Sequence, residues 1–286
     1  MKYRQNTIRF IRTFGLMAAF CLLLGAVEGP STDVKSEKPR GEVRTVVLDP
    51  GHGGRDPGAV GPGGVFEKDV VLEVCRRIKE KLEKRGFRVV LTRDKDVFVK
   101  LRERAQIANC AKADIFISVH ANASRRGGWG FETYFLSATA SDDEARKVAL
   151  LENHAAMLED VQNGGLSPEI NSDIEAILLD MAQAEYVRES EKLAVIIQDH
   201  LDDILKSPNR GVKQAPFMVL MGAAMPAVLV EIGFVSSRKE VKLLKSPEMQ
   251  NRIAESLSGS VCKFAAQRAI RLGLGEGPKN IAAEGS

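Results

Sequence analysis

The feature that most constrains the fold is a regular alternation of short apolar runs with longer amphipathic stretches. Runs of strand length are rich in β-branched residues, and the stretches between them have the period of a helix. The expected strands cover 45–49, 87–92, 115–119, 130–136 and 227–230, and the expected helices cover 68–85, 99–111, 190–205 and 246–268. Because strands joined through helices pair in parallel, the sequence predicts an α/β fold. We expect an open, mostly parallel twisted sheet with helices on both faces, of the phosphorylase/hydrolase-like kind.

Three of these strands run directly into side chains that can bind a metal ion or move a proton. The first enters the glycine-rich sequence DPGHGG, which carries His52; the third is followed by His120 and the last by Glu231. Ligands of open α/β sheets bind at the carboxyl ends of the strands. A single histidine at a strand end is explained as well by a structural hydrogen bond. Two of only four histidines at such ends favour a metal site.

Other polar residues near these strand ends have two interpretations each. Glu67 begins the first helix, where the helix dipole alone stabilises an acidic side chain. Arg93 either orients a substrate carboxylate or, as we favour, forms a salt bridge that holds its loop. Asn122 either donates a hydrogen bond near a metal or forms a turn. Glu132 either supports a metal ligand or pairs with a charge on a neighbouring strand.

The positive net charge of +3 lies at the amino end of the chain. The first twelve residues hold four basic and no acidic side chains, and the rest is nearly balanced, which argues against a nucleic-acid partner. An apolar run follows the basic residues, so we interpret 1–29 as an export signal and 30–42 as a linker. A buried amino-terminal helix is the alternative, and the cleavage point stays open. Lipidation at Cys21 is disfavoured because bulky Phe20 precedes it. The expected location is the periplasm or cell envelope, with no stable membrane domain after cleavage.

The remaining cysteines give no disulfide framework. Cys75, Cys110 and Cys262 are odd in number and widely spaced, with no CxxC pair. We expect them to be small core residues rather than zinc ligands.

Seven runs of the sequence, in order, resemble one family, the zinc N-acetylmuramoyl-L-alanine amidases of the type 3 amidase family. The runs are VVLDPGHGGRDPGA, FEKDVVLEV, VVLTRDKD, LRERAQIAN, ADIFISVHAN, GFETYFLS and PAVLVEIGFVS. The resemblance extends from about Thr45 to Phe264. It implies a monomeric peptidoglycan hydrolase that cleaves the amide bond between N-acetylmuramic acid and the L-alanine of the stem peptide, in cell-wall remodelling and daughter-cell separation.

The resemblance also implies the residues of the site. His52, Glu67 and His120 correspond to the zinc ligands of the family, and Glu231 corresponds to its catalytic carboxylate. Three protein ligands leave the fourth zinc position open for water, as catalytic zinc sites require. Zinc lowers the pKa of a bound water from about 15.7 to about 7, which makes a nucleophile available near neutral pH.

The connection over 137–189 is much longer than the usual four to six or so residues, so it is interpreted as a helical insertion. Helical patterns cover 142–162 and 172–186, with the breaker NGGLSP between them. In long-form relatives a helix of this insertion covers the zinc cleft until an activator with a LytM-type domain removes it. The resemblance therefore implies an autoinhibitory lid, and the candidates for a blocking carboxylate are Glu152, Glu159 and Glu175. A static flap or an extra substrate wall is the alternative.

The expected organisation is therefore a catalytic domain over 43–268 that contains the insertion, with a disordered tail over 269–286. Two rival functions remain at this stage. One is a zinc peptidase that cuts within the stem peptide, and the other is an envelope-binding module without activity.

Overall fold

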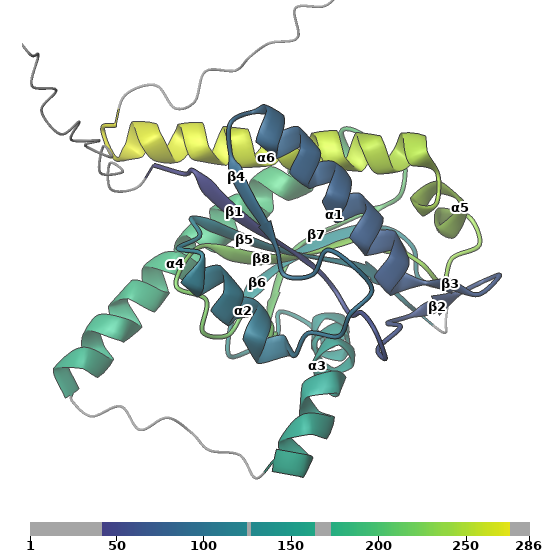
Figure 1. The fold of residues 1–286 in the computed structure, drawn as a ribbon, viewed down its shortest axis with the longest axis horizontal. Coiled ribbons are helices and arrows are strands. Elements are labelled where there is room, and N and C mark those ends of the chain that lie inside the picture. Colours follow the sequence, from purple (N-terminus) through teal and green to yellow (C-terminus); the bar gives the residue numbers. More distant parts are fainter. Residues whose placement is uncertain (1–41, 125–126, 164–172, 275–286) are drawn as a thin grey trace, which may run out of the picture. The chain divides into compact units, whose positions relative to one another are not determined.

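Six strands form the central sheet, in the order β4-β1-β5-β8-β6-β7 (Figure 1). The structure is a computed structural model that describes residues 42–124, 127–163 and 173–274, without the side chains of 155–163 and 173–182. The predicted export signal, most of the linker and the end of the tail lie outside the described residues. The strands are β1 (Thr45–Pro50), β4 (Arg88–Leu91), β5 (Ile115–Asn122), β6 (Phe131–Leu136), β7 (Asn209–Ala215) and β8 (Ala227–Phe234).

The sheet is mixed but mostly parallel. β4, β1, β5 and β8 run parallel to one another, β6 runs antiparallel to β8, and β7 is parallel to β6. The sheet is open, because β4 and β7 are its two edges. The predicted fold class is confirmed.

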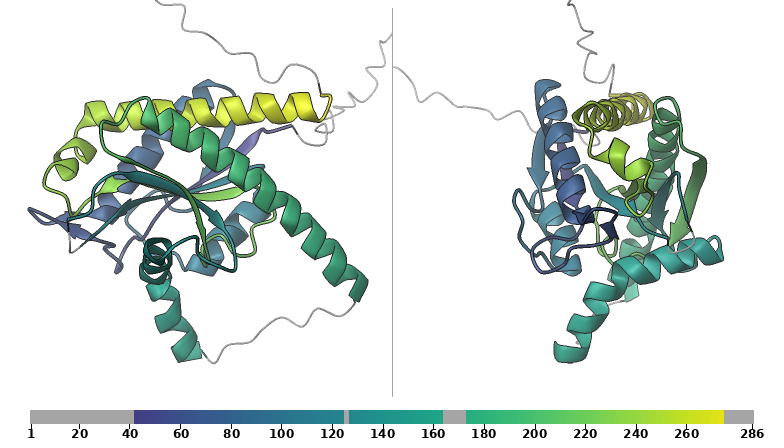
Figure 2. Two further views of the ribbon diagram at one scale, coloured as in Figure 1. Left: turned by 180° about the vertical axis from the view of Figure 1, so that it is seen from behind. Right: turned by 90° about the vertical axis from the view of Figure 1, so that its right-hand side faces the viewer.

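Helices cover both faces of this sheet. They are α1 (Glu67–Lys84), α2 (Leu101–Cys110), α3 (Asp143–Asn163), α4 (Asp173–Asp202), α5 (Glu240–Leu244) and α6 (Pro247–Arg271). Residues of α1, α4 and α6 belong to one hydrophobic cluster, and residues of α2 and α3 belong to the other. Figure 2 shows α4 and α6 packed against each other along one face. A small hairpin of β2 (Val60–Gly61) and β3 (Val65–Phe66) precedes α1. None of the described helices is long and apolar enough to cross a membrane.

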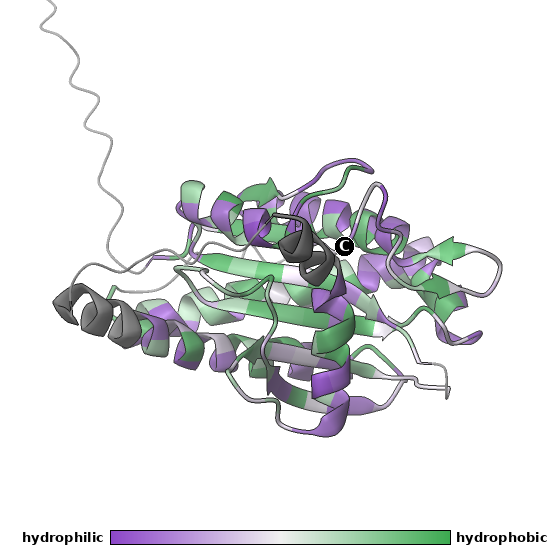
Figure 3. Ribbon diagram, turned by 90° about the horizontal axis from the view of Figure 1, so that it is seen from below, coloured by the Kyte–Doolittle hydropathy of each residue, from purple (hydrophilic) through white to green (hydrophobic). Residues whose placement is uncertain are grey.

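Strand periodicity explains the two clusters. In β1, Val46 and Leu48 pack on the side of α1, whereas Val47 between them packs on the side of α2 and α3. β5 and β8 repeat the same alternation, and all of these side chains are buried. Such strands are apolar on both faces, which Figure 3 shows as hydrophobic ribbons among helices of mixed hydropathy. Each buried aliphatic side chain contributes about 1.5–3 kcal/mol to folding.

Two buried arginines hold the turn that follows β1. Arg104 donates to Asp49 Oδ1 and to the carbonyl oxygen of His52, both at 2.8 Å. Arg93 donates to the carbonyl oxygen of Gly51 at 2.8 Å and to other backbone carbonyls. The salt bridge expected for Arg93 is therefore wrong: among the described side chains it makes no ion pair, and it fixes the turn through backbone oxygens.

The helices expected over 172–186 and 190–205 are one continuous helix, α4. No glycine or proline separates the two patterns. Ser190, at the expected break, donates to the carbonyl oxygen of Tyr186 at 2.6 Å, which satisfies its hydroxyl inside a helix. The boundary expected at residue 189 therefore falls inside a helix.

Three smaller differences from the expected fold concern an additional edge strand, the end of α6 and the burial of two cysteines. β7 was not expected, because its sequence NRGVKQA has no apolar alternation; as an edge strand it is buried incompletely. α6 continues to Arg271, so the first residues assigned to the tail are helical. Cys75 is buried as expected, but Cys110 is exposed at the end of α2, and Cys262 is half-buried.

Candidate metal centre

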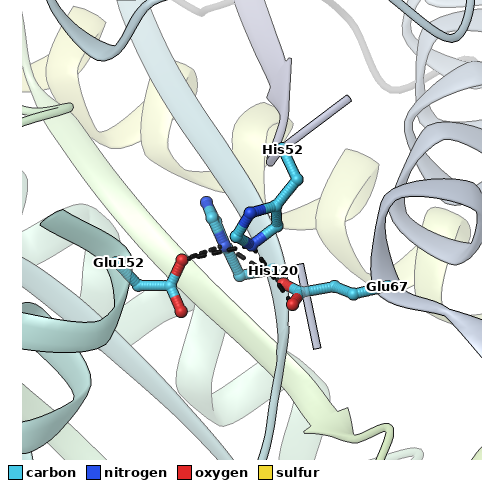
Figure 4. A group of neighbouring side chains, drawn as sticks. All are labelled: His52, Glu67, His120 and Glu152. Atoms are coloured by element: carbon cyan, nitrogen blue, oxygen red, sulfur yellow. Dashed lines mark ion pairs between the residues drawn. The ribbon is translucent and has the colours of Figure 1, made fainter. Parts of the chain in front are cut away.

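Four side chains from distant parts of the chain meet at the carboxyl ends of β1 and β5 (Figure 4). His52 lies in the turn after β1, Glu67 begins α1, His120 lies in β5, and Glu152 lies in α3. One nitrogen or oxygen atom from each lies within 4.8 Å of the others. The three residues predicted to be ligands are thus brought together, and the insertion adds a fourth.

Four contacts within this group are close to the spacing of neighbouring ligands in a zinc site. His52 Nε2 lies 3.1 Å from Glu67 Oε2 and 3.2 Å from Glu152 Oε2. His120 Nδ1 lies 3.2 Å from Glu67 Oε1 and 2.9 Å from Glu152 Oε2. Ligands that surround a zinc ion tetrahedrally at about 2.0–2.1 Å lie about 3.3 Å from one another.

The hydrogen bonding of these atoms tests whether a metal ion fits. His52 Nε2, His120 Nδ1 and Glu152 Oε2 are all buried, and none has a hydrogen-bond partner, although they lie close together. A buried polar atom without a partner costs about 1–3 kcal/mol, so three at one point call for a ligand. With neutral imidazoles the four residues carry two negative charges, which a divalent cation balances. The group fits a divalent metal ion.

Glu67 is held by the backbone independently of any metal. Its Oε1 accepts a hydrogen bond from the amide of Ala121 and its Oε2 accepts one from the amide of Ala59, both at 2.9 Å. The side chain is buried at the first turn of α1. These two bonds fix both carboxylate oxygens beside the histidines, a role that the helix dipole alone does not explain.

His52 is oriented by a residue that the sequence did not indicate. Asp56 Oδ2 lies 2.9 Å from His52 Nδ1, so the imidazole donates there and turns Nε2 toward the centre. His52 has a φ of 59°, in the left-handed region that few side chains adopt. In the sequence, the only indication that Asp56 could contact His52 was its position four residues later.

Two glycines allow the backbone to approach the imidazoles. A Cβ on Gly51 would lie 2.4 Å from His120 Cε1, and one on Gly58 would lie 2.6 Å from His52 Cδ2. Gly58 also has a φ of 63°. The two rings meet edge to face with their centroids 4.9 Å apart. The glycines of the turn are thus required by the close contact of loop and ligand.

Glu231 lies beside this group on the neighbouring strand. β5 and β8 pair in parallel with the Cα atoms of His120 and Glu231 in register. Its carboxyl is fully buried, and neither oxygen has a hydrogen-bond partner. Burial raises the pKa of Glu231 well above its usual value, and the nearby charge of Glu152 raises it further. His120 and Glu231 lie inside their strands rather than after them, because each strand continues past its apolar run.

The carboxylates also set the pKa values of the histidines. Burial lowers the pKa of His120, but Glu152 and Glu67 outweigh burial and raise it to about 10. The pKa of His52 is raised well above its usual value: burial lowers it, but the charges of Glu67 and Glu152 outweigh burial. Without a metal, protons on the imidazoles supply the positive charge that the carboxylates require.

Comparison with known proteins assigns the chain to a family. The sequence profile of the Amidase_3 family, N-acetylmuramoyl-L-alanine amidase, matches residues 46–263. The chain belongs to this family. It is 35% identical to the amidase AmiC of Neisseria meningitidis over 80% of this chain and 54% of that protein. It is 33% identical to AmiA of Escherichia coli over 79% of this chain and 78% of that protein. The chain spans about half the length of the AmiC relatives it matches.

Solved structures of the amidase family share the fold. AmiC2 of Nostoc punctiforme superposes with a TM-score of 0.57 and 31% identity, covering 77% of this chain and 96% of that one. The amidase of Clostridium difficile 630 superposes with a TM-score of 0.58 and 26% identity, covering 78% and 97%.

In this member of the amidase family, Asn122 and Glu132 bond to one another and are not among the four clustered side chains. Asn122 Nδ2 donates to Glu132 Oε1 at 2.9 Å. Glu132 is buried and pairs with Arg210 and Lys213 of β7, each at 3.1 Å. Of the two interpretations of Glu132, the structure agrees with the cross-strand pair.

Two cavities flank the part of α3 that carries Glu152. One, of about 380 Å³, opens onto His52 and Glu67, and the other, of about 420 Å³, opens onto Arg210. Asn122 and Leu151 line both cavities, so Leu151 of α3 lies between them. The side chains of Glu159 and Glu175 lie outside the described residues, and Glu152 is the blocking candidate that the structure places at the site.

Proposed function

We propose that this chain is a zinc-dependent N-acetylmuramoyl-L-alanine amidase that hydrolyses the amide bond between N-acetylmuramic acid and L-alanine in peptidoglycan. The observation that carries the proposal is the meeting of two imidazoles and a backbone-held carboxylate beside the buried carboxyl of Glu231. Membership in the amidase family supports the choice of bond.

The geometry and the family resemblance support the following roles. His52, Glu67 and His120 hold the zinc ion, and imidazole and carboxylate are ligands that zinc accepts. A bound zinc ion supplies a water molecule of lowered pKa and polarises the amide carbonyl. Glu231 accepts the proton of the attacking water and delivers it to the leaving nitrogen of L-alanine. Replacing His52 or His120 should lose the metal, as measured by elemental analysis.

The test is mass spectrometry of purified peptidoglycan digested by the mature protein, with and without a chelator. An amidase releases intact stem peptides whose amino terminus is L-alanine, and the chelator should abolish the release. Cleavage within the stem would instead support the zinc peptidase. No product from zinc-loaded protein, also after removal of the Glu152 carboxylate, would support the binding module.

We further propose that α3 is an autoinhibitory lid and that Glu152 is the blocking ligand. With Glu152 in place, four protein ligands surround the centre, which is the closed arrangement of structural zinc sites. A catalytic site needs the fourth position for water, so turnover requires Glu152 to leave. Asn153 holds this part of α3 through two hydrogen bonds of 2.8 Å, to the carbonyl of Pro216 and from the amide of Met218.

An activator would act on the equilibrium between the closed state, with Glu152 at the centre, and an open state in which Glu152 has left. A partner with a LytM-type domain that binds only the open state shifts molecules toward it, in proportion to its preference for that state. The insertion of this chain is the surface where such a partner would bind.

The lid is tested by two matched substitutions. Glu152→Ala should raise the digestion of purified sacculi by about tenfold or more, because it opens the fourth position. Glu185→Ala removes a carboxylate from α4 whose described partner is Arg188 at the surface, and should change nothing. Equal activity of Glu152→Ala and the unaltered chain, with equal zinc content, would refute the lid and leave the amidase proposal intact.

The proposed location is the periplasm or cell envelope, where a monomer acts in wall remodelling and daughter-cell separation. The basic and apolar leader over 1–29 supports export. Fractionation of cells, with sequencing of the mature amino terminus, tests export and finds the cleavage point.

A further inference from the structure

The strongest unexplained feature is a pair of cations on β7 beside the second cavity. Arg210 and Lys213 share one buried carboxylate, that of Glu132, each at 3.1 Å. One carboxylate balances one cation, so the group retains an excess positive charge. Arg210 lines the cavity of about 420 Å³ and lies over the ring of Phe234, with its Cζ 5.3 Å from the ring centroid. This ring and Glu132 hold the guanidinium in one orientation.

In the closed state, Glu144 of α3 and Asp142, which directly precedes α3, pair with these cations. Glu144 lies 2.7 Å from Arg210 and 3.7 Å from Lys213, and Asp142 lies 3.4 Å from Lys213. The Glu144 side chain is 65% exposed, whereas Glu132 is fully buried. Removal of Glu144 would free Arg210 Nη2 at the cavity, while Arg210 Nε stays bonded to Glu132.

The helix that covers the metal group thus presents two carboxylates to the protein at once. Glu152 reaches the metal group and Glu144 reaches Arg210, eight residues earlier on the same helix. Eight residues of α-helix span about 12 Å. An extended peptide advances about 3.3–3.6 Å per residue, so a substrate lying along the path of α3 would cover this span with three or four residues.

We propose that Arg210 is a specificity residue that binds a carboxylate of the stem peptide about three residues beyond the cleaved amide, and that Glu144 occupies this position in the closed state. This inference rests on the proposed amidase function. It adds the class of substrate, a stem peptide with a free carboxylate about three residues beyond the cleaved amide. Arginine suits the role because its planar guanidinium binds carboxylates through paired donors. In this arrangement, α3 imitates the substrate at the metal group and at Arg210.

The test compares two synthetic N-acetylmuramoyl tetrapeptides that differ only at the side chain of the third residue, a carboxylate in one and a carboxamide in the other. All other acids are blocked as amides. The assays use zinc-loaded full-length chain in the Glu152→Ala background, in which the fourth metal position is open. A charged hydrogen bond of ordinary strength predicts that kcat/KM favours the carboxylate about tenfold.

Three variants locate the preference. Arg210→Gln should bring the ratio close to one by raising KM for the carboxylate substrate, with the carboxamide substrate unaffected. Arg210→Lys should keep part of the ratio. Arg146→Gln is the matched control, because it removes an exposed arginine of α3 that pairs with Asp143 on its own helix. Equal losses on both substrates in Arg210→Gln would assign Arg210 a structural role and overturn the proposal.

A binding measurement separates this inference from the amidase proposal. Trp129 is the single tryptophan, is half exposed and follows Gly128, which lines the cavity. Its fluorescence reports binding of the free tetrapeptides without turnover. Tighter binding of the carboxylate peptide, strengthened by Glu144→Gln, supports the site even if neither substrate is cleaved. Cleavage of both substrates at equal rates with equal binding overturns the site and leaves the amidase intact.

Discussion

Glu67 and Glu152 touch the same two histidines, but the protein holds them in different ways. Glu67 receives hydrogen bonds from two backbone amides, whereas Glu152 Oε2 has no hydrogen-bond partner. Glu67 therefore keeps its place when the metal is removed, and Glu152 is held only by the attraction of the centre and by the docking of α3. We call the part at the sheet edge the permanent part of the site, and the part from the insertion the removable part, as the proposed lid requires.

The largest effect is expected within the permanent part. Glu231→Gln should reduce peptidoglycan hydrolysis by about a hundredfold or more, the usual contribution of a general acid–base group. Zinc content should not change, because Glu231 is not among the four clustered residues. Activity is measured as released stem peptide and zinc by elemental analysis. An active Gln variant with normal zinc would remove Glu231 from the mechanism.

The two carboxylates themselves give the next prediction. Glu67→Ala should weaken zinc binding by more than the 10- to 100-fold or so that is typical of outer-shell changes, because it removes a ligand fixed by the backbone. Glu152→Ala should retain zinc through dialysis. Competition with a chromogenic chelator measures both. Equal zinc losses in the two variants would contradict the distinction between permanent and removable ligands.

Asp56 extends the comparison to the residues behind the ligands. Asp56→Ala should lower zinc affinity about 10- to 100-fold, since His52 would lose the contact that orients its ring. Asp96→Ala is the control: Asp96 accepts from the amide of Gly54 in the same loop and pairs with Lys68, without touching a ligand. An affinity that falls as much in the control would indicate that the loop as a whole, and not the contact with His52, is responsible.

The smallest effect is expected at the docking of the removable part. Asn153→Ala should raise basal activity several-fold, because two hydrogen bonds that favour the closed state are lost, each contributing about 1 kcal/mol. Asn109 of α2 is the matched control, since it makes the same two kinds of hydrogen bond, with Gly222 and Ala224. The helix α2 contributes no residue to the metal group. If Asn109→Ala raises activity equally, the cause is loosening of the loop between β7 and β8, to which both asparagines bond, rather than loosening of α3.

The sequence predicted the permanent region better than the removable one. Buried strands have strong apolar patterns, and the carboxyl ends of parallel strands converge, so His52, His120 and Glu231 were placed together before the structure. Glu67 was predicted to be a ligand only from the family resemblance, because its position at a helix start is explained as well by the helix dipole. Whether these residues bind metal and catalyse hydrolysis stays a prediction.

The parts that sequence did not predict depend on tertiary contacts. Three carboxylates of the insertion were equivalent until the docking of α3 placed Glu152 at the histidines. β7 has a polar sequence because its charged side chains pair with buried Glu132, a partner far away in the chain. The sequence did not predict the continuity of α4 because serine is common at helix boundaries, whereas in the structure Ser190 lies inside the helix and bonds to Tyr186.

The register between His120 and Glu231 has a consequence for regulation. Both residues belong to neighbouring strands joined by the backbone ladder, so displacement of α3 leaves their spacing unchanged. We expect that an activator changes the fraction of molecules in the open state. Each open molecule should hydrolyse its substrate at the same intrinsic rate, whichever partner opened it.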